Sequence, residues 1–83
     1  MKHDLDTMAE GAVILDGLDD AIVGIAEEFG NGKRILYSKY KIFEILVRRD
    51  NMTYSDAEEF YNYNILGMYV SPQNPVFLDV ELR

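Results

Sequence analysis

The chain has no cysteine and no tryptophan, and His3 is its only histidine. Without cysteine it can form neither a disulfide nor a thiolate zinc site, and it lacks a thiol nucleophile. A single histidine makes a general base or a histidine-based metal centre hard to assemble. We therefore expect a protein that is not an enzyme and that binds no metal and no cofactor.

Long apolar runs are also missing. No stretch approaches the ~18 consecutive apolar residues that a membrane-spanning helix requires. The first ten residues, MKHDLDTMAE, lack the apolar region of a secretory signal peptide. Together with the absence of cysteine, these features predict a cytoplasmic protein without a membrane partner.

The length of 83 residues fits one small domain. The apolar content of 48% is typical of a globular protein and too high for a disordered one. Residues 1–10 are polar and show no periodic pattern, so we expect a flexible N-terminus there. Residues 11–83 are expected to form a single folded domain.

The net charge of −7 is unevenly distributed along the chain. Residues 1–29 carry net −7, residues 30–49 carry net +5 and residues 50–83 carry net −5. An acidic chain repels the phosphate backbone, so direct binding of nucleic acid is not expected. We expect the basic middle segment to form a solvated face that pairs with the acidic flanks of the same molecule.

Residues 18–29 are compatible with either a helix or a strand. Helical spacing would align four apolar side chains in one stripe, at Leu18, Ile22, Ile25 and Phe29. The β-branched residues at 22, 23 and 25, with a glycine at 24, favour a strand instead. Because Gly-Asn-Gly at 30–32 is typical of a hairpin loop, and 33–37 can supply a return strand, we favour the strand.

Two helices joined by a short link follow this β-hairpin. Ser38 is a favoured N-cap residue, and the helix it begins should end near Asn51, which tolerates a left-handed conformation. Thr53 with Asp56 resembles a capping box and begins the second helix, which Gly67 ends. Helical spacing places four residues of the second helix on its inner face, namely Ala57, Phe60, Tyr61 and Asn64.

The last segment, residues 75–82, alternates apolar and polar side chains as a strand does. A loop with prolines at 72 and 75 precedes it, after a short extended piece at 68–70. The predicted order is β-β-α-α-β. This order indicates an α+β domain with a three-stranded antiparallel sheet and the helical hairpin packed on one face of that sheet.

Several short motifs occur in a fixed order, namely Gly17-x-x-Asp20-Ala21-Ile22-Val23-Gly24, Asp50-Asn51-Met52-Thr53, Ala57-Glu58-Glu59-Phe60, Asn64 and Pro75-Val76-Phe77. Over residues 14–78 this succession resembles a family of short uncharacterised proteins from bacteriophages and prophages. Members of that family often carry glycine at the positions of Asn51 and Ser71. The resemblance implies a phage origin and a location in the host cytoplasm, and it implies no activity or catalytic residue.

The aromatic residues, six Tyr and four Phe, exceed what a core of this size needs. Tyrosine is favoured at protein interfaces because it buries a large area and keeps a polar tip. The outer face of the second helix is the candidate partner-binding surface, with Asp56, Glu58, Glu59, Tyr63 and Tyr54. Tyr61 and Asn64 form a candidate pocket, because a buried amide needs a hydrogen-bonding partner that a ligand could supply.

These features support three hypotheses of different classes. The first is a binding protein that acts on a host or phage protein, and its sharpest form is an anti-defence inhibitor of the anti-CRISPR kind whose acids imitate phosphate charges. The second is a structural or self-assembling accessory protein that forms a homodimer. The third is a binder of a small molecule, such as a nucleotide signal, near Tyr61 and Asn64.

Overall fold

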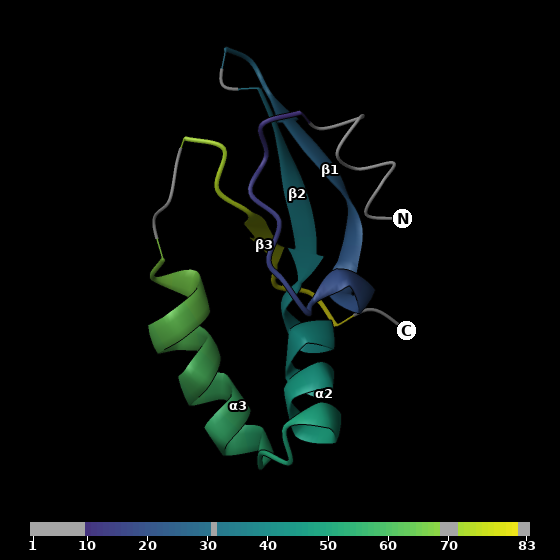
Figure 1. Cartoon of the computed structure of the whole chain (residues 1–83), viewed down its shortest axis with the longest axis vertical. Helices are drawn as coiled ribbons and strands as arrows, with labels where there is room; N and C mark the ends of the chain where they lie inside the picture. The colour runs from purple at the N-terminus through teal and green to yellow at the C-terminus, as the bar shows by residue number, and fades with distance from the viewer. Residues whose placement is uncertain (1–9, 31, 69–71, 82–83) are drawn as a thin grey trace.

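The computed structural model of the chain describes residues 10–30, 32–68 and 72–81 (Figure 1). In these ranges the elements are η1 (Asp19–Ala21), β1 (Ile22–Glu28), β2 (Gly32–Ser38), α2 (Lys39–Arg49), α3 (Tyr54–Phe60), η2 (Tyr61–Leu66) and β3 (Val76–Leu78). The predicted α+β class and the β-β-α-α-β order are confirmed. The predictions made for residues 1–9 and 69–70 lie outside the described residues.

β1 and β2 form an antiparallel hairpin, so the strand interpretation of this segment is confirmed. Their register pairs Ile25 with Ile35. Gly30 and Gly32 near the turn have φ angles of +82° and +74°, which glycine adopts without steric cost. The hairpin reverses at this point and projects at the top of Figure 1.

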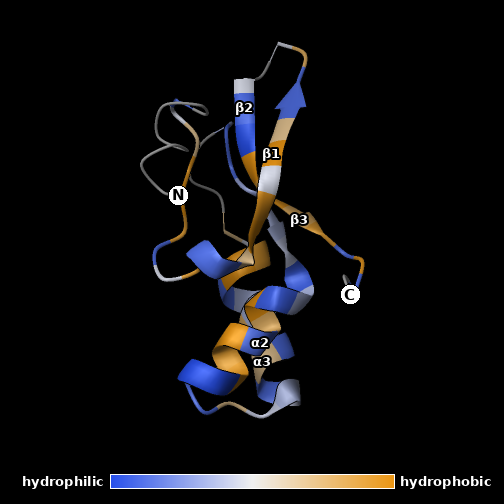
Figure 2. Cartoon of the chain, turned by 90° about the vertical axis from the view of Figure 1, so that its right-hand side faces the viewer, coloured by the Kyte–Doolittle hydropathy of each residue, from blue (hydrophilic) through white to orange (hydrophobic). Residues whose placement is uncertain are grey.

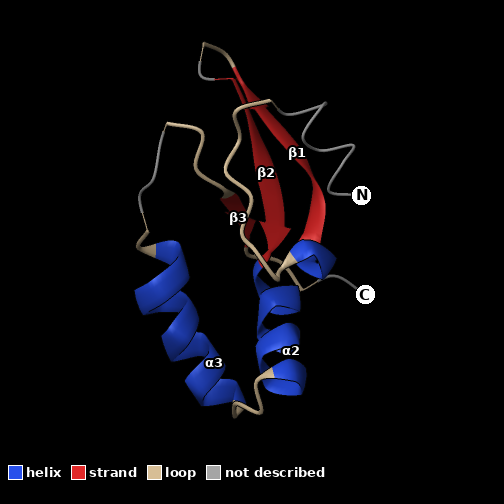
Figure 3. Cartoon of the chain, in the orientation of Figure 1, coloured by secondary structure: helices blue, strands red, loops and turns tan. Residues whose placement is uncertain are grey.

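The third strand corrects the predicted sheet. β3 lies beside β2 and runs parallel to it, pairing Leu36 with Val76 and Ser38 with Leu78, so the sheet is mixed. The helices explain the direction, because α2 leads the chain away from the end of β2 and α3 with η2 leads it back (Figures 1 and 3). Parallel neighbours need such a crossover. β3 is also shorter than the strand predicted over residues 75–82.

The helical pair extends beyond the end of the sheet in Figures 1 and 3, rather than lying flat on one sheet face as predicted. α2 begins directly after β2, and the side chain of Ser38 caps it by accepting a hydrogen bond from the N–H of Lys41 at 3.3 Å. Because no loop separates strand from helix, the chain cannot fold back over the sheet at this point. α2 therefore continues away from β2.

The link between the two helices agrees with its local sequence signals. Asn51 has a φ of +60°, the left-handed conformation expected of it. The side chain of Thr53 accepts a hydrogen bond from the N–H of Asp56 at 3.1 Å, which confirms the predicted N-cap. Met52, next to this cap, is partly buried and packs against the core.

The second helix departs from the prediction after Phe60. η2 is a π-helix, whose i→i+5 hydrogen bonds give wider turns than those of an α-helix. The buried side chains of α3 and η2 are spaced by four residues, at Ala57, Tyr61 and Ile65. Phe60 and Asn64, which were predicted to face inward, are exposed. Ile65 occupies the inward position that Asn64 would hold in a continuous α-helix.

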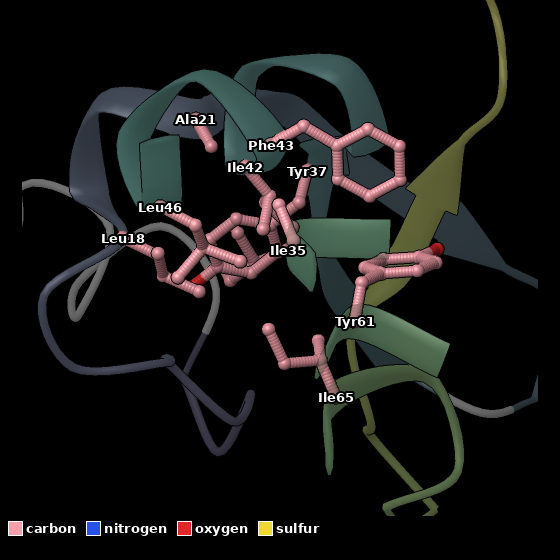
Figure 4. Packing of buried hydrophobic residues seen from close by; sticks show 10 residues of the cluster. Leu18, Ala21, Ile35, Tyr37, Ile42, Phe43, Leu46, Tyr61 and Ile65 are labelled. Carbon is pink, nitrogen blue, oxygen red and sulfur yellow. The ribbon is translucent and has the colours of Figure 1, made fainter. Parts of the chain in front are cut away.

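The core lies where the helices meet the end of the sheet (Figure 4). Its buried hydrophobic side chains, among the described residues, are Leu18, Ala21, Ile35, Tyr37, Ile42, Phe43, Leu46, Ala57, Tyr61 and Ile65. The ring of Tyr61 meets those of Phe43 and Phe77 edge to face, with both centroid distances at 5.4 Å. In Figure 2 the ends of β1 and β2 farthest from this core are hydrophilic.

Residues 10–18 run beside the sheet and are tied to it by hydrogen bonds. The side-chain amide of Gln73 donates to the carbonyl oxygens of Glu10 at 3.2 Å and Lys33 at 2.9 Å. The hydroxyl of Tyr37, which is fully buried, accepts from the N–H of Leu15 at 2.8 Å. The second contact joins this segment to the core.

Replacing Tyr37 by phenylalanine is expected to lower the free energy of unfolding by about 1–2 kcal/mol. The ring packing survives this change, but the N–H of Leu15 loses its partner. Urea unfolding measures the loss. Tyr40→Phe is the matched control, because the hydroxyl of Tyr40 bonds to Asp79 at the surface and its removal should cost less. Equal losses in both variants would contradict a special role for the Tyr37 hydroxyl.

Candidate interaction surface on the second helix

The burial pattern of α3 and η2 determines which side chains face solvent. Because the buried positions are four residues apart, the residues between them remain at the surface. They include two acids, to which the exposed Asp56 before Ala57 adds a third, and two large aromatic side chains, Phe60 at 38% and Tyr63 at 79% exposed. We call the following residues the acidic-aromatic surface: Asp56, Glu58, Glu59, Phe60, Tyr63 and Asn64.

Most of the acidic-aromatic surface borders one depression with a volume of about 420 Å³. The residues that line it are Met52, Asp56, Glu59, Phe60, Tyr63 and Asn64. The structure therefore brings together three of the predicted partner-binding residues, Asp56, Glu59 and Tyr63. Glu58 and Tyr54, which were also predicted, are exposed but do not line the depression. The ring of Tyr54 packs edge to face against the ring of Phe43, at a centroid distance of 5.3 Å.

The predicted pocket of Tyr61 and Asn64 is not formed as expected. Tyr61 is 2% exposed, and it does not line the depression in which Asn64 lies. The ammonium group of Lys39 lies 5.7 Å from the centre of the Tyr61 ring. Burial raises the pKa of Tyr61 to about 12, and the negative charge of Asp79 adds to the rise. Tyr61 thus belongs to the core, and Asn64 belongs to the surface.

Two residues of the depression, Phe60 and Met52, were not predicted to contribute to a surface. Sequence periodicity assigned Phe60 to the inner face. Phe60 ends α3, before the π-helix begins at Tyr61, and it is 38% exposed although Ala57 and Tyr61 on either side of it are buried. It lies at the edge of the inner face, where helical spacing alone does not determine burial.

The acids of this surface carry uncompensated charge. None of Asp56, Glu58 and Glu59 forms an ion pair with any residue that the structure describes. Three carboxylates thus stand near two exposed aromatic rings. Carboxylates accept hydrogen bonds from guanidinium and ammonium groups, and aromatic faces attract the same cations. This combination can bind arginine or lysine side chains of a partner.

The basic middle segment, by contrast, is largely neutralised within the molecule. Three of its cations pair with acids of the flanking segments, at N–O distances of 3.0–3.4 Å, in the pairs Arg34–Glu28, Lys39–Asp79 and Arg49–Asp50. The predicted pairing of this segment with its acidic flanks is confirmed for these residues. Arg49 also donates to the carbonyl oxygen of Gly17 at 2.7 Å.

In residues 10–30, 32–68 and 72–81, no three acidic or histidine side chains converge closely enough to hold a metal ion. None of the helices in those ranges combines the length and the apolar character needed to cross a membrane.

Comparisons of the chain with protein-family models, with curated proteins and with solved structures found no significant match. The resemblance to phage proteins therefore stays a prediction. So does the biochemical role, which can be inferred only from the chemistry of the surface.

Proposed function

We propose that the chain is a small phage-encoded binding protein that uses the acidic-aromatic surface to occupy a basic site on a host or phage protein. The observation that carries this proposal is the clustering of Asp56 and Glu59 with the exposed rings of Phe60 and Tyr63 around one depression, where neither acid pairs with a cation of the described residues. Exposed aromatic residues with a polar rim are characteristic of interface centres. The proposal assigns the chain no catalytic step and no cofactor.

The charges of the surface define the partner chemistry. A partner that presents arginine next to an apolar side chain would place its guanidinium on Glu59 or Asp56 and stack over Tyr63. Basic sites of this kind commonly serve to bind nucleic acid. The sharpest form of the proposal is therefore an inhibitor of a nucleic-acid-binding defence protein, similar in action to an anti-CRISPR protein. It would act in the cytoplasm of the host.

The test is a crosslinking pull-down from bacterial lysate with the tagged full-length chain. Reversing two charges, in the variant Glu58→Lys/Glu59→Lys, is expected to weaken capture of the specific partner by about 10–100-fold. The variant should keep the unfolding transition of the parent chain, because both residues are exposed and form no ion pair within the part of the chain that the structure describes. Band intensities across a dilution series measure the change in capture.

A matched control reverses two exposed acids elsewhere, in Glu10→Lys/Glu81→Lys, and gives the same net charge. It should capture the partner as the parent chain does. Recovery of no partner above background would count heavily against the proposal. Equal weakening by both double variants would show a nonspecific charge effect, and loss of the unfolding transition in the Glu58 and Glu59 variant would show that these residues serve the fold.

The alternative of a small-molecule binder at Tyr61 and Asn64 is less well supported, because Tyr61 is buried and Asn64 lies on the surface. A thermal-shift screen of nucleotides tests this alternative directly. A nucleotide that raises the melting temperature would favour it over protein binding.

A further inference from the structure

An apolar hollow adjoins the depression of the acidic-aromatic surface. It has a volume of about 280 Å³ and lies between the N-terminal segment, α2 and η2. Its apolar side chains are Leu15, Leu18, Leu46, Phe60, Ile65 and Met68. Leu18, Leu46 and Ile65, which are labelled in Figure 4, come from these three parts of the chain. An engineered cavity of about 150 Å³ with similar lining binds benzene, so the hollow has room for one apolar side chain of a partner.

The charged groups at the rim of the apolar hollow do not repel a basic partner. The guanidinium of Arg49 donates to the two carboxylate oxygens of Asp50, at 3.0 and 3.1 Å, and to the carbonyl oxygen of Gly17 at 2.7 Å. The charge of this arginine is therefore neutralised by its neighbour. Asp16 adds an acid to the same rim. The hollow thus offers an apolar contact inside a rim that has no net positive charge.

The depression beside the hollow supplies the attraction for a cation. Asp56 and Glu59 line it, and neither pairs with a cation of the residues that the structure describes. Phe60 and Asn64 line both the depression and the hollow, so the two adjoin. One segment of a partner can therefore place a cationic side chain in the depression and an apolar side chain in the hollow.

The depression and the hollow are offset by one helical turn. Along α3 and η2, the depression is lined from Asp56 to Asn64, and the hollow is lined from Phe60 to Met68. An offset of four residues corresponds to about 6 Å along a helix axis. Side chains at positions i and i+4 of a helix start from Cβ atoms that are about 5–6 Å apart. A second helix lying along this surface can thus fill both with side chains one turn apart.

We propose that the partner binds through a basic amphipathic helix that places an arginine in the depression and a leucine in the apolar hollow, one turn apart. This inference rests on the proposed function, to which it adds the hollow and the spacing. Charge complementarity selects the occupant, because Asp56 and Glu59 attract a cation and the rim of the hollow does not oppose it. A helix in a groove buries its apolar face while its charged residues meet the rim.

The probe is a helical peptide of about 16 residues, built from alanine and glutamine around one central leucine. It carries one arginine a turn before the leucine and another a turn after it, so that either direction of the helix brings an arginine to the depression. NMR titration of the full chain is expected to give a dissociation constant of about 0.1–1 mM. A matched peptide, with both arginines moved two positions closer to the leucine and so to the opposite face, should bind about 10-fold more weakly.

Two variants of the chain test the depression and the hollow separately. Asp56→Asn/Glu59→Gln removes the charges of the depression and should weaken binding of the peptide by about 10-fold. Met68→Gln makes the hollow more polar without a change of charge and should weaken binding by about 5-fold. Leu66→Gln is the matched control, because Leu66 is exposed in the same element and lines neither site. It should bind the peptide as the parent chain does.

Replacing the leucine of the peptide by alanine tests the hollow again without any change to the protein, so the result does not depend on how the Met68 variant folds. Absence of binding between the parent chain and the first peptide overturns the inference, as does equal binding of the two arginine arrangements. If only the acidic variant binds weakly, while Met68→Gln and the alanine peptide bind normally, the hollow is not used and the proposed function stands. If the acidic variant binds as the parent chain does, the proposed function fails together with the inference.

Discussion

Replacing Tyr61 by alanine is expected to lower the free energy of unfolding by about 3–5 kcal/mol. The ring is 2% exposed and joins three parts of the fold, since it lies in η2 and contacts Phe43 of α2 and Phe77 of β3. Removing it opens a cavity between these elements and ends both edge-to-face contacts. A small domain has only about 5–10 kcal/mol of stability in total, so the variant should be largely unfolded in mild urea.

Urea unfolding followed by circular dichroism measures this loss. Tyr61→Phe is the matched control, because it keeps the ring and should retain most of the stability at pH 7. Leu66→Ala, at an exposed position of the same element, should have little effect. If Tyr61→Ala unfolds at the same urea concentration as the parent chain, the ring does not hold these elements together.

The protein is also expected to lose stability as the pH rises from about 10 to about 12. The pKa of Tyr61 is raised from 10.0 to about 12 in the folded state, mainly because burial disfavours the phenolate. The folded state favours the neutral phenol, and this preference contributes to the free energy of unfolding. The contribution is complete while the pH is below the pKa of Tyr61 in the unfolded chain, and it is lost as the pH rises through the pKa of Tyr61 in the folded chain. A difference of about two pKa units corresponds to about 3 kcal/mol.

Urea midpoints at pH 9, 10, 11 and 12 follow this loss. Burial also raises the pKa of Tyr37, and the hydrogen bond to Asp79 raises the pKa of Tyr40, so three tyrosines contribute to the decline. Tyr61→Phe should flatten the decline while leaving the contributions of Tyr37 and Tyr40 in place. A variant that declines as steeply as the parent chain would show that Tyr61 does not titrate with unfolding.

The parts of the fold that local chemistry determines could be predicted from the sequence. Ser38 and Thr53 begin their helices as capping residues, and Asn51 takes the left-handed conformation that ends the first helix. β-branched residues and a glycine-rich loop gave the β-hairpin. In each case a few neighbouring residues decide the outcome, so no tertiary contact has to be known.

The direction of β3 and the inward face of η2 could not be predicted, because each depends on distant contacts. Val76 pairs with Leu36, which is forty residues away, and nothing in its own segment indicates a parallel neighbour. In η2 the buried position after Tyr61 is Ile65, and Asn64 lies on the surface, where it lines the depression with Phe60. The acids of the candidate surface were predicted because they are polar and lie on one helix, but the depression between them was not.

The π-helical turn has a consequence for how this chain could change over time. An α-helix with one residue fewer would bury the same inner side chains, because Ala57, Tyr61 and the present Ile65 would then follow the ordinary spacing of four and three. The core does not require the additional residue. Removing one residue between Tyr61 and Ile65 would therefore preserve the packing and leave two exposed residues there in place of three. The additional residue in η2 changes what the second helix displays and not what it buries.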